Sequence, residues 1–501
     1  MYFLGIDVGT GGTRALVIDE SGKVVSSTAA EHLPFASPQI GWAEQDPAEW
    51  WRACAVAVKG ALSHEGIRAE QIAAVGFSGQ MHGAVLLDAQ GQVVRPAPIW
   101  CDVRTEKQAQ ELTSQIGAER LRKLTCNSAL TNFTLTKCLW VRENEPENWN
   151  RVRSVMLPKD YVRFRLTDER ATDMADASGT LLLDVANRRW SEPMLDLVRM
   201  DRALLPALYE SPEVCGEVSQ AGATATGLIA GTPVVAGAGD QAAGAIGMGV
   251  ISPGAVSATI GTSGVVLAAT NLPALDPEGR VHTFCHAMAD RWIVMGVTQA
   301  AGLSLRWFRN QFGAGNGHGD SSHADSYEDL TALAAKIPAG ADGLLWAPYL
   351  MGERTPYLDA NARGMLAGLT ASHTRAHVIR AILEGVAFSL RDTFTIFEQI
   401  EVPVKTIRLG GGGARSPLWR QIQADVYGQE VGTVAVEEGA AYGAAILAGV
   451  GAKAWPTVDA ACAAVVRVAG TTVPNAKDSA TMNRAYSSYR RIYPAMKAIL
   501  N

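Results

Sequence analysis

Two short segments rich in glycine and threonine have the residue types of turns that bind phosphate. The first is DVGTGGT, residues 7–13, and the second is IGTSG, residues 260–264. Glycine lets several backbone N–H groups point at one anion, and threonine hydroxyls add hydrogen bonds. A hairpin whose glycines only accommodate positive φ explains the first segment equally well. The presence of the second segment favours the phosphate-binding interpretation, because two such turns can hold a polyphosphate from opposite sides.

A third glycine cluster, at residues 410–413, stands between a predicted strand at 404–409 and a predicted helix at 417–427. A nucleotide can approach the backbone closely where a strand ends in glycines and a helix begins. The alternative is an ordinary strand-to-helix turn that needs small residues. The sequence has no GxxxxGK[ST] motif and no complete GxGxxG motif. It therefore excludes a P-loop NTPase and disfavours a nicotinamide-dependent dehydrogenase.

Two aspartates follow predicted strands and have the chemistry for a reaction at bound phosphate. Asp240 comes after the apolar strand at 233–236 and stands among small residues that let a substrate approach. A carboxylate there can accept a proton from a hydroxyl group, although an aspartate that caps a helix starting at Gln241 is the alternative. Asp7 ends the first predicted strand, where a carboxylate suits a hydrated Mg²⁺ ion.

Polar residues also follow the predicted strand at 72–78, at the strand end where α/β proteins bind ligands. Gln80, Met81 and His82 stand there, and His82 has the hydrogen-bonding groups to contact a polyol. A packed histidine is the alternative. Asp102 and Arg104 form a further polar pair, which we interpret as a salt bridge within a loop.

The elements around these residues predict a duplicated α/β domain. Strands are expected at 2–8, 14–19 and 23–28, and apolar residues at helical spacing predict a helix at 47–62. Residues 255–269 again have the pattern strand, glycine-threonine turn, strand. The turn threonines, Thr10 and Thr262, are about half the chain apart, which indicates two similar halves with a cleft between them. Residues 313–326 are polar and rich in glycine and serine, and predict an exposed loop.

The composition of the 501 residues excludes several classes of protein. With 48% hydrophobic and 19% charged residues, the chain is neither a disordered protein nor a coiled coil, and no apolar run is long enough to span a membrane. The net charge of −6 argues against a nucleic-acid partner. Seven dispersed cysteines and no secretory signal favour reduced thiols and a cytoplasmic location.

The motifs, taken together, resemble those of the FGGY carbohydrate kinases and occur in the same order. They are DVGTGGTR, SGQMHG, LPKDY, GDQAAGA, IGTSG, GERTP and GGGARS, with a C-terminal signature in GMLAGL, His377 and AILE. The resemblance covers nearly the whole chain. It implies two actin-like ATPase (ribonuclease H-like) domains with an interdomain cleft: a sugar-binding domain at 1–245 and an ATP-binding domain at 246–501.

The same resemblance assigns roles to individual residues. Asp240 is implied as the general base, and Asp7 as a catalytic residue that positions Mg²⁺ through water. The implied sugar-binding residues are Gln80, Met81, His82, Asp240 and Gln241. The implied ATP-binding residues are Thr10, Gly11, Gly12, Arg14, Thr262, Gly302, Gly412 and Gly413.

Within the family the chain is most similar to the xylulokinases, which implies ATP-dependent phosphorylation of D-xylulose. Gln241 stands where xylulokinases usually have asparagine, and Cys101 where asparagine is common. Both residues are near the expected sugar site, so a kinase for gluconate or a related ketose or polyol is an alternative. A non-catalytic actin-like module is a second alternative, although it has no need of a base beside a sugar site. Relatives suggest a homodimer, with no membrane partner.

Overall fold

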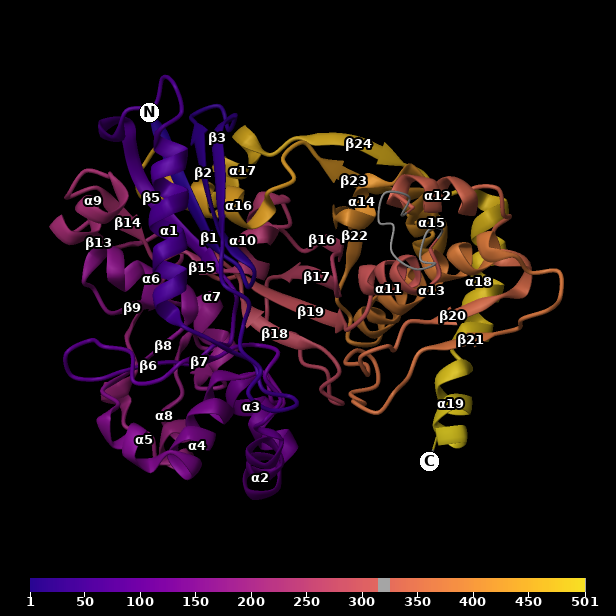
Figure 1. Cartoon of the computed structure of the whole chain (residues 1–501), viewed down its shortest axis with the longest axis horizontal. Helices are drawn as coiled ribbons and strands as arrows, with labels where there is room; N and C mark the ends of the chain where they lie inside the picture. Colours follow the sequence, from indigo (N-terminus) through magenta and orange to yellow (C-terminus); the bar gives the residue numbers. More distant parts are fainter. Residues whose placement is uncertain (314–324, 501) are drawn as a thin grey trace. The chain divides into compact units, whose positions relative to one another are not determined.

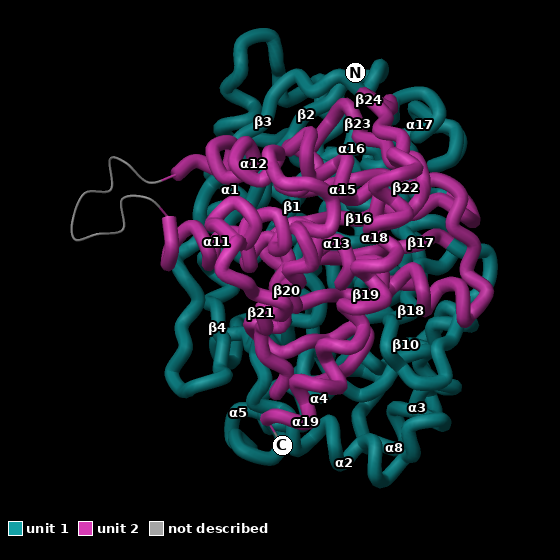
Figure 2. The backbone as a smooth tube through the Cα atoms, turned by 90° about the vertical axis from the view of Figure 1, so that its right-hand side faces the viewer, with its two compact units in different colours: residues 1–251, 270–293, 438–466 teal, residues 252–269, 294–437, 467–501 magenta. Residues whose placement is uncertain are grey.

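The computed structural model describes residues 1–313 and 325–500, which divide into two compact units (Figure 2). Unit 1 consists of residues 1–251, 270–293 and 438–466, and unit 2 of residues 252–269, 294–437 and 467–501. Both units therefore include segments from distant parts of the sequence, unlike the contiguous domains 1–245 and 246–501 that the resemblance implies. Residues 314–324 of the predicted exposed loop lie outside the described residues.

The main sheet of unit 1 begins with the predicted meander. Strands β1 (Tyr2–Val8), β2 (Gly12–Asp19) and β3 (Val24–Glu31) pair antiparallel, and β5 (Ile72–Gly79) pairs parallel with β1. The sheet continues through β14 (Pro233–Val235) to β13 (Val214–Glu217), and β15 (Ala238–Gly239) also pairs with β5. The strand ends of β1, β5 and β15 thus bring residues 7, 80 and 240 to one region of unit 1.

Helices cover both faces of this sheet, because side chains alternate along β1. Leu4, Ile6 and Val8 share a core with Trp50 of α1 (Pro47–Leu62), the helix that the sequence predicts with the same bounds. On the other face, α16 (Gly439–Gly451) packs against β1 and β5 and also contacts α10 (Asp240–Gly247). Figure 1 shows α1 on one side of these strands and α16 on the other.

Close approach of α16 depends on glycine in the sheet. A Cβ atom on Gly5 would lie 2.0 Å from the carbonyl oxygen of Ala441, and one on Gly76 would lie 2.0 Å from that of Ala444. The α10–α16 contact is equally close, since a Cβ atom on Gly443 would lie 1.8 Å from Ala243 O. Any side chain at these positions would push α16 away. Residues 438–466 therefore belong to unit 1 although they are near the C-terminus.

Smaller elements complete unit 1. The strands are β4 (Glu44–Gln45), β6 (Val85–Leu87), β7 (Ala97–Pro98), β8 (Ser154–Met156), β9 (Ala171–Asp173), β10 (Leu183–Asp184), β11 (Arg189–Trp190), β12 (Ala207–Tyr209) and β18 (His282–Cys285). The helices are α2 (Glu106–Ile116), α3 (Ala118–Thr125), α4 (Thr134–Asn144), α5 (Pro146–Arg151), α6 (Pro158–Thr167), α7 (Met174–Ala177), α8 (Glu192–Val198), α9 (Gln220–Thr226) and α17 (Val458–Val465).

The sheet of unit 2 repeats the arrangement of unit 1, which confirms the predicted duplication. Strands β16 (Gly254–Ile260) and β17 (Gly264–Thr270) form an antiparallel hairpin, as β1 and β2 do. Strand β22 (Val404–Gly411) pairs parallel with β16, as β5 does with β1. The sheet continues through β23 (Val431–Val434) to β24 (Val468–Thr472), and β19 (Trp292–Thr298) lies beside β17.

The helices of unit 2 pack around the long buried helix α13 (Arg375–Gln399). The others are α11 (Gly302–Phe312), α12 (Tyr327–Ala334), α14 (Gly412–Arg415), α15 (Pro417–Tyr427), α18 (Ala476–Tyr489) and α19 (Ile492–Leu500), with a small sheet of β20 (Leu345–Ala347) and β21 (Met365–Ala367). Helix α15 has the predicted bounds. Among the described residues, no helix combines the length and apolar character needed to cross a membrane.

Candidate active site

Asp240, the predicted general base, is the first residue of α10 and follows β15 directly. The N-cap of α10 is Gly239, so Asp240 does not occupy the capping position that was its alternative, although the backbone of Gln241 forms a hydrogen bond with its carboxyl group. Its side chain is half-buried. Burial and the negative charge of Asp7 raise the pKa of Asp240 to about 7, although hydrogen bonding by Gln241 opposes this shift. A carboxyl group with this pKa is poised to exchange a proton near neutral pH.

Asp7 is the penultimate residue of β1, opposite Arg14 on β2 and Ser78 on β5. Burial raises the pKa of Asp7, and the Ser78 side chain and the charge of Arg14 partly offset this. Apart from this Asp7–Ser78 interaction, Asp7 Oδ1 and Ser78 Oγ are buried without a hydrogen-bond partner among the described residues. An orphaned carboxylate oxygen is the kind of ligand that hard divalent cations prefer, so the residues present fit a hydrated cation.

The first glycine-threonine turn is shorter than the sequence suggests. Gly12 and Thr13 belong to β2, and Thr13 is buried with its Oγ1 2.9 Å from His32 Nε2. The Thr10 hydroxyl donates to Gln80 Oε1 at 3.2 Å and accepts from Trp100 Nε1 at 2.9 Å. Its proton is therefore already used within unit 1, and the backbone rather than the Thr10 hydroxyl is left to donate to a phosphate.

Space for a ligand exists at the tip of this turn. Gly11 is exposed, and a Cβ atom built on it would meet nothing within 4 Å. Gly12 is half-buried at the start of β2, where it pairs with Glu31 of β3. Arg14 extends along the sheet surface and donates to Ser27 Oγ at 2.9 Å.

Gln80 supports the turn through its amide group. The amide nitrogen donates to Gln45 Oε1 at 3.0 Å and to Gly9 O at 3.5 Å, while the oxygen accepts from Thr10. Gln45 in turn donates to Thr10 O at 2.8 Å. Both N–H groups of the Gln80 amide are thus engaged, which leaves an acceptor position on Oε1 for any sugar contact.

His82 has a backbone conformation that is rare for a residue other than glycine, with φ of 70°. Two buried donors hold its carbonyl oxygen: Thr134 Oγ1 at 3.2 Å and Lys137 Nζ at 3.2 Å. The ring nitrogen Nδ1 lies 2.8 Å from Gly179 O. Since a carbonyl only accepts, Nδ1 carries a proton. Such a fixed, strained residue is typical of a functional site.

Met81 brings the predicted sugar-binding loop next to the predicted base. A Cβ atom on Gly239 would lie 2.8 Å from Met81 Cγ and 3.2 Å from Asp176 Oδ1. Glycine is therefore required before Asp240, and Met81 contacts the backbone from which Asp240 projects. The structure brings Met81, His82 and Asp240 together within unit 1, with Gln241 following on α10.

A cluster of buried charges lies behind this loop, and the sequence analysis missed it. Lys159 Nζ lies 2.6 Å from Asp160 Oδ1, 2.5 Å from Asp173 Oδ2 and 3.6 Å from Asp176 Oδ2, and Arg163 Nη1 lies 3.0 Å from Asp160. The three carboxylates are close enough together to hold a metal ion. The Lys159 ammonium group already contacts all three, so this cluster is a charge network. Its only signal in the sequence was the LPKDY motif.

Asp102 and Arg104 form the predicted salt bridge. Arg104 Nη2 lies 2.6 Å from Asp102 Oδ2, and the guanidinium group stacks 3.6 Å from the ring centre of Trp42. The backbone N–H of Ala43 also donates to Asp102 at 2.7 Å. The pair is buried. It holds two loops together, and Cys101 beside it is half-buried.

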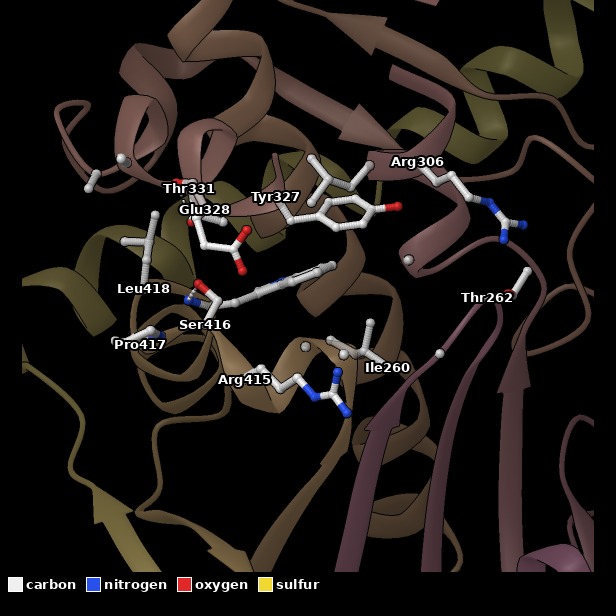
Figure 3. A pocket seen from close by; sticks show the side chains of 18 residues that line it. Ile260, Thr262, Arg306, Tyr327, Glu328, Thr331, Arg415, Ser416, Pro417 and Leu418 are labelled. Carbon is white, nitrogen blue, oxygen red and sulfur yellow. Dashed lines mark hydrogen bonds between the residues drawn. The ribbon is translucent and has the colours of Figure 1, made fainter. Parts of the chain in front are cut away.

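Unit 2 contains a pocket of about 620 Å³ that collects all four predicted ATP-binding residues of this unit. Thr262, Gly302, Gly412 and Gly413 line it, from the β16–β17 turn, the start of α11 and α14. Figure 3 shows Thr262 at one end of this pocket and Ser416, Pro417 and Leu418 at the other. The pocket has the volume and the glycine-rich wall that a nucleotide needs.

Glycine is necessary in this wall because segments touch through their backbones. Gly302 N donates to Gly261 O at 2.9 Å, and Leu303 N donates to Thr262 O at 3.1 Å. A Cβ atom on Gly302 would lie 2.3 Å from Gly261 O, and one on Gly413 would lie 2.7 Å from Ile260 Cβ.

Helix α12 supplies a wall of this pocket that the sequence motifs do not predict. Tyr327, Glu328 and Thr331 line the pocket and face Arg415 and Ser416 across it (Figure 3). The guanidinium group of Arg309 stacks 4.3 Å from the centre of the Tyr327 ring, which holds α12 near α11. These residues belong to no glycine motif, so their types alone give no sign of a ligand.

Comparison with known proteins agrees with this arrangement. Residues 2–247 match the N-terminal domain of the FGGY family of carbohydrate kinases, and residues 256–452 match its C-terminal domain. The chain is 38% identical to a xylulose kinase of Bacillus subtilis strain 168 over 99% of this chain and 97% of that protein. It is 32% identical to a gluconokinase of the same strain, over 89% of this chain and 86% of that protein.

A solved structure from Brucella ovis, described as a xyloylose kinase, covers 100% of both chains with a TM-score of 0.91 and 35% identity. The predicted fold of two actin-like domains is thus confirmed, and the family is one of enzymes, which decides against a non-catalytic module. The matched domains span both the predicted base and the nucleotide-sized pocket. The chain therefore belongs to the FGGY family of carbohydrate kinases and is an ATP-dependent enzyme that phosphorylates a sugar.

Proposed function

We propose that this enzyme transfers the γ-phosphate of ATP to the terminal hydroxyl of D-xylulose and forms D-xylulose 5-phosphate. The observation that carries this proposal is the position of Asp240, whose neighbour Gly239 packs against Met81 and whose carboxyl group has a pKa of about 7. The xylulose kinases among the relatives support the choice of sugar.

Asp240 is the general base in the proposed mechanism. Its ionised carboxylate accepts the proton of the sugar hydroxyl as the oxygen attacks the γ-phosphorus in line and ADP leaves. Met81 and His82 contact the ketose, and Gln241 is beside the reacting end. Gln80 orders the neighbouring turn and offers Oε1 as a further acceptor.

The pocket of unit 2 binds ATP in this proposal. Thr262 contacts the phosphates, and Gly302, Gly412 and Gly413 line the adenosine side. The turn of unit 1 adds backbone donors at Thr10, Gly11 and Gly12, with Arg14 nearby. The proposed sugar-binding and ATP-binding domains are residues 1–245 and 246–501, although residues 270–293 and 438–466 of the second belong to unit 1.

Asp7 is the residue that would hold Mg²⁺, through water. Its orphaned Oδ1 supports this assignment. The ion, when bound, offsets the negative charge of the transferring phosphate. Asp7 then has a second effect, because its own charge raises the pKa of the base.

The same proposal includes a homodimer without a nucleic-acid or membrane partner, and a cytoplasmic location. Support for the location comes from the cysteines, all seven of which are free thiols. Burial raises the pKa of several of them, for example Cys54, so that the reactive thiolate form is disfavoured.

Gluconate is the second candidate substrate, because a gluconokinase is also among the relatives and Gln241 departs from the usual xylulokinase pattern. The test is a comparison of kcat/KM for D-xylulose, gluconate and glycerol at saturating Mg-ATP, with ADP release measured in a coupled assay. The kcat/KM for D-xylulose is expected to exceed that for gluconate and for glycerol by at least about tenfold. This ratio corresponds to about 1.4 kcal/mol of discrimination between substrates. A higher kcat/KM for gluconate would overturn the choice of sugar and leave the role of Asp240 intact.

A further inference from the structure

The GERTP motif, residues 352–356, has no role in the mechanism above, yet its glutamate is one of the most connected side chains of unit 2. Glu353 is only 3% exposed. Its Oε2 accepts from the hydroxyls of Thr298 at 2.5 Å and Ser389 at 3.4 Å. Its Oε1 accepts from the backbone N–H groups of Gln299 at 2.9 Å and Arg354 at 2.8 Å. All four donors are neutral groups.

A second residue of the motif ties the same two segments together. Thr355 Oγ1 accepts from Val297 N at 3.0 Å, and Thr355 N donates to Val297 O at 2.9 Å. Residues 297–299, at the end of β19, are therefore fixed to residues 353–355 by both backbone and side-chain hydrogen bonds. Burying a carboxylate to make such bonds is unfavourable, and burial raises the pKa of Glu353 to about 7.

The segment that Glu353 fixes leads directly into the nucleotide-sized pocket. Three residues after Gln299, Gly302 begins α11 and contacts Gly261 through its backbone. There is no space for a Cβ atom on Gly302, so the backbones of Gly302 and Gly261 are in close contact. A shift at residues 298–299 would therefore move Gly302 against the turn that contains Thr262.

We propose that Glu353 is a positioning residue of the nucleotide site, whose buried carboxylate fixes residues 298–302 so that Gly302 and Thr262 form one preorganised wall. The inference rests on the proposed function, because it takes the pocket of unit 2 as the ATP site. Glu353 does not line the pocket. It acts through the backbone of Gln299.

The test measures ATP binding by calorimetry without sugar, together with KM for ATP and for the sugar. Glu353→Ala leaves the N–H groups of Gln299 and Arg354 without their buried acceptor, so the Kd for ATP is expected to rise about tenfold. KM for the sugar is expected to stay within about twofold, since its residues are in unit 1. Glu353→Gln is expected to recover most of the loss, because its amide oxygen still accepts from both N–H groups and the Thr298 hydroxyl can turn to accept.

A matched control is Asp392→Asn. Asp392 is also buried on α13, and it accepts from Tyr486 of α18 at 2.6 Å. Its negative charge contributes to the raised pKa of Glu353, but it takes part in none of the four hydrogen bonds of Glu353, so Asp392→Asn leaves those bonds in place. It is expected to leave the Kd for ATP unchanged. An equal weakening in Asp392→Asn, or an unchanged Kd in folded Glu353→Ala, would overturn the proposal.

Two milder variants keep the test decisive if Glu353→Ala does not fold. Thr298→Val and Thr355→Val each remove one hydroxyl at constant side-chain shape, and each is expected to weaken ATP binding about two- to threefold. Unchanged ATP binding in both would overturn the positioning role.

The variant Gly413→Ala tests whether the pocket of unit 2 is the ATP site, independently of the role of Glu353. If it abolishes ATP binding while Glu353→Ala does not, only the positioning role fails, whereas undiminished binding in Gly413→Ala removes the pocket assignment.

Discussion

The charge of Asp7 at the end of β1 raises the pKa of Asp240 at the start of α10. Neither carboxyl group forms a salt bridge with a lysine or arginine of the described residues, and burial acts on both in the same direction. Two neighbouring carboxyl groups with raised pKa values are typical of a site that handles protons and cations. This relationship underlies the first two predictions.

The first prediction concerns the pH dependence of the reaction. The base must be ionised to accept the proton, and the pKa of Asp240 is about 7. The kcat/KM for the sugar is therefore expected to fall as the pH decreases below about 7, approaching tenfold for each further unit. ATP binding measured over the same range serves as the control. A rate that is flat down to pH 5.5 would contradict the assignment.

The second prediction concerns stability. Because folding raises the pKa of Asp240, ionisation destabilises the folded state, and this effect is absent below about pH 4 and complete above pH 7. At pH 8, Asp240→Asn is expected to unfold at a higher urea concentration than the wild type. Its free energy of unfolding should be greater by about 1–2 kcal/mol, the range expected for a half-buried group. The difference should vanish near pH 4. A less stable variant at pH 8 would show that the carboxylate is well solvated or paired.

The third prediction compares two adjacent glycines of the nucleotide pocket. A Cβ atom on Gly413 would lie 2.7 Å from Ile260 Cβ, whereas one on Gly412 would meet only Ile260 O at 3.8 Å. Gly413→Ala is therefore expected to lose about 1–3 kcal/mol of stability and to weaken ATP binding. The free energy of unfolding of Gly412→Ala should be within about 0.5 kcal/mol of that of the wild type. Calorimetric melting and ATP titration of both variants test this, and equal melting temperatures would contradict it.

The fourth prediction concerns the buried charge network of unit 1. Lys159→Met leaves Asp160, Asp173 and Asp176 without the ammonium group that contacts them. It is expected to lower the free energy of unfolding by about 3–5 kcal/mol. Asp176→Asn is the matched variant. Burial and the neighbouring aspartates raise the pKa of Asp176 well above its ordinary value, so a neutral amide resembles its protonated form.

Asp176→Asn should therefore change the free energy of unfolding by less than about 1 kcal/mol. Urea denaturation at pH 7.5 measures both variants. If Asp176→Asn destabilises the protein as strongly as Lys159→Met, the network depends on an ionised Asp176.

Local features of the fold could be predicted from the sequence. The strand–turn–strand segments at the start of each unit and the helices α1 and α15 follow from spacing and from glycine and proline at their ends. The position of α16 could not be predicted. Its contact with Gly5 and Gly76 joins residues more than 360 positions apart, and a glycine required for such a contact does not differ in sequence from one in a turn.

The candidate site was predictable only in part for a similar reason. Glycine motifs point to Thr262, Gly302 and Gly412, which indeed line one pocket. Tyr327 and Glu328 line the same pocket but have the types of ordinary surface residues. Lys159 and Asp160 would normally be solvated, and only the fold shows that they are buried.

The central claim, that Asp240 is the base, is tested most directly by Asp240→Asn, assayed for sugar phosphorylation and for ATP binding. Loss of a general base predicts that kcat falls by about 10²- to 10⁴-fold. The Kd for ATP should stay within about twofold, because the proposed nucleotide pocket is built from residues of unit 2. Turnover close to that of the wild type, in a variant that binds both substrates, would contradict the account.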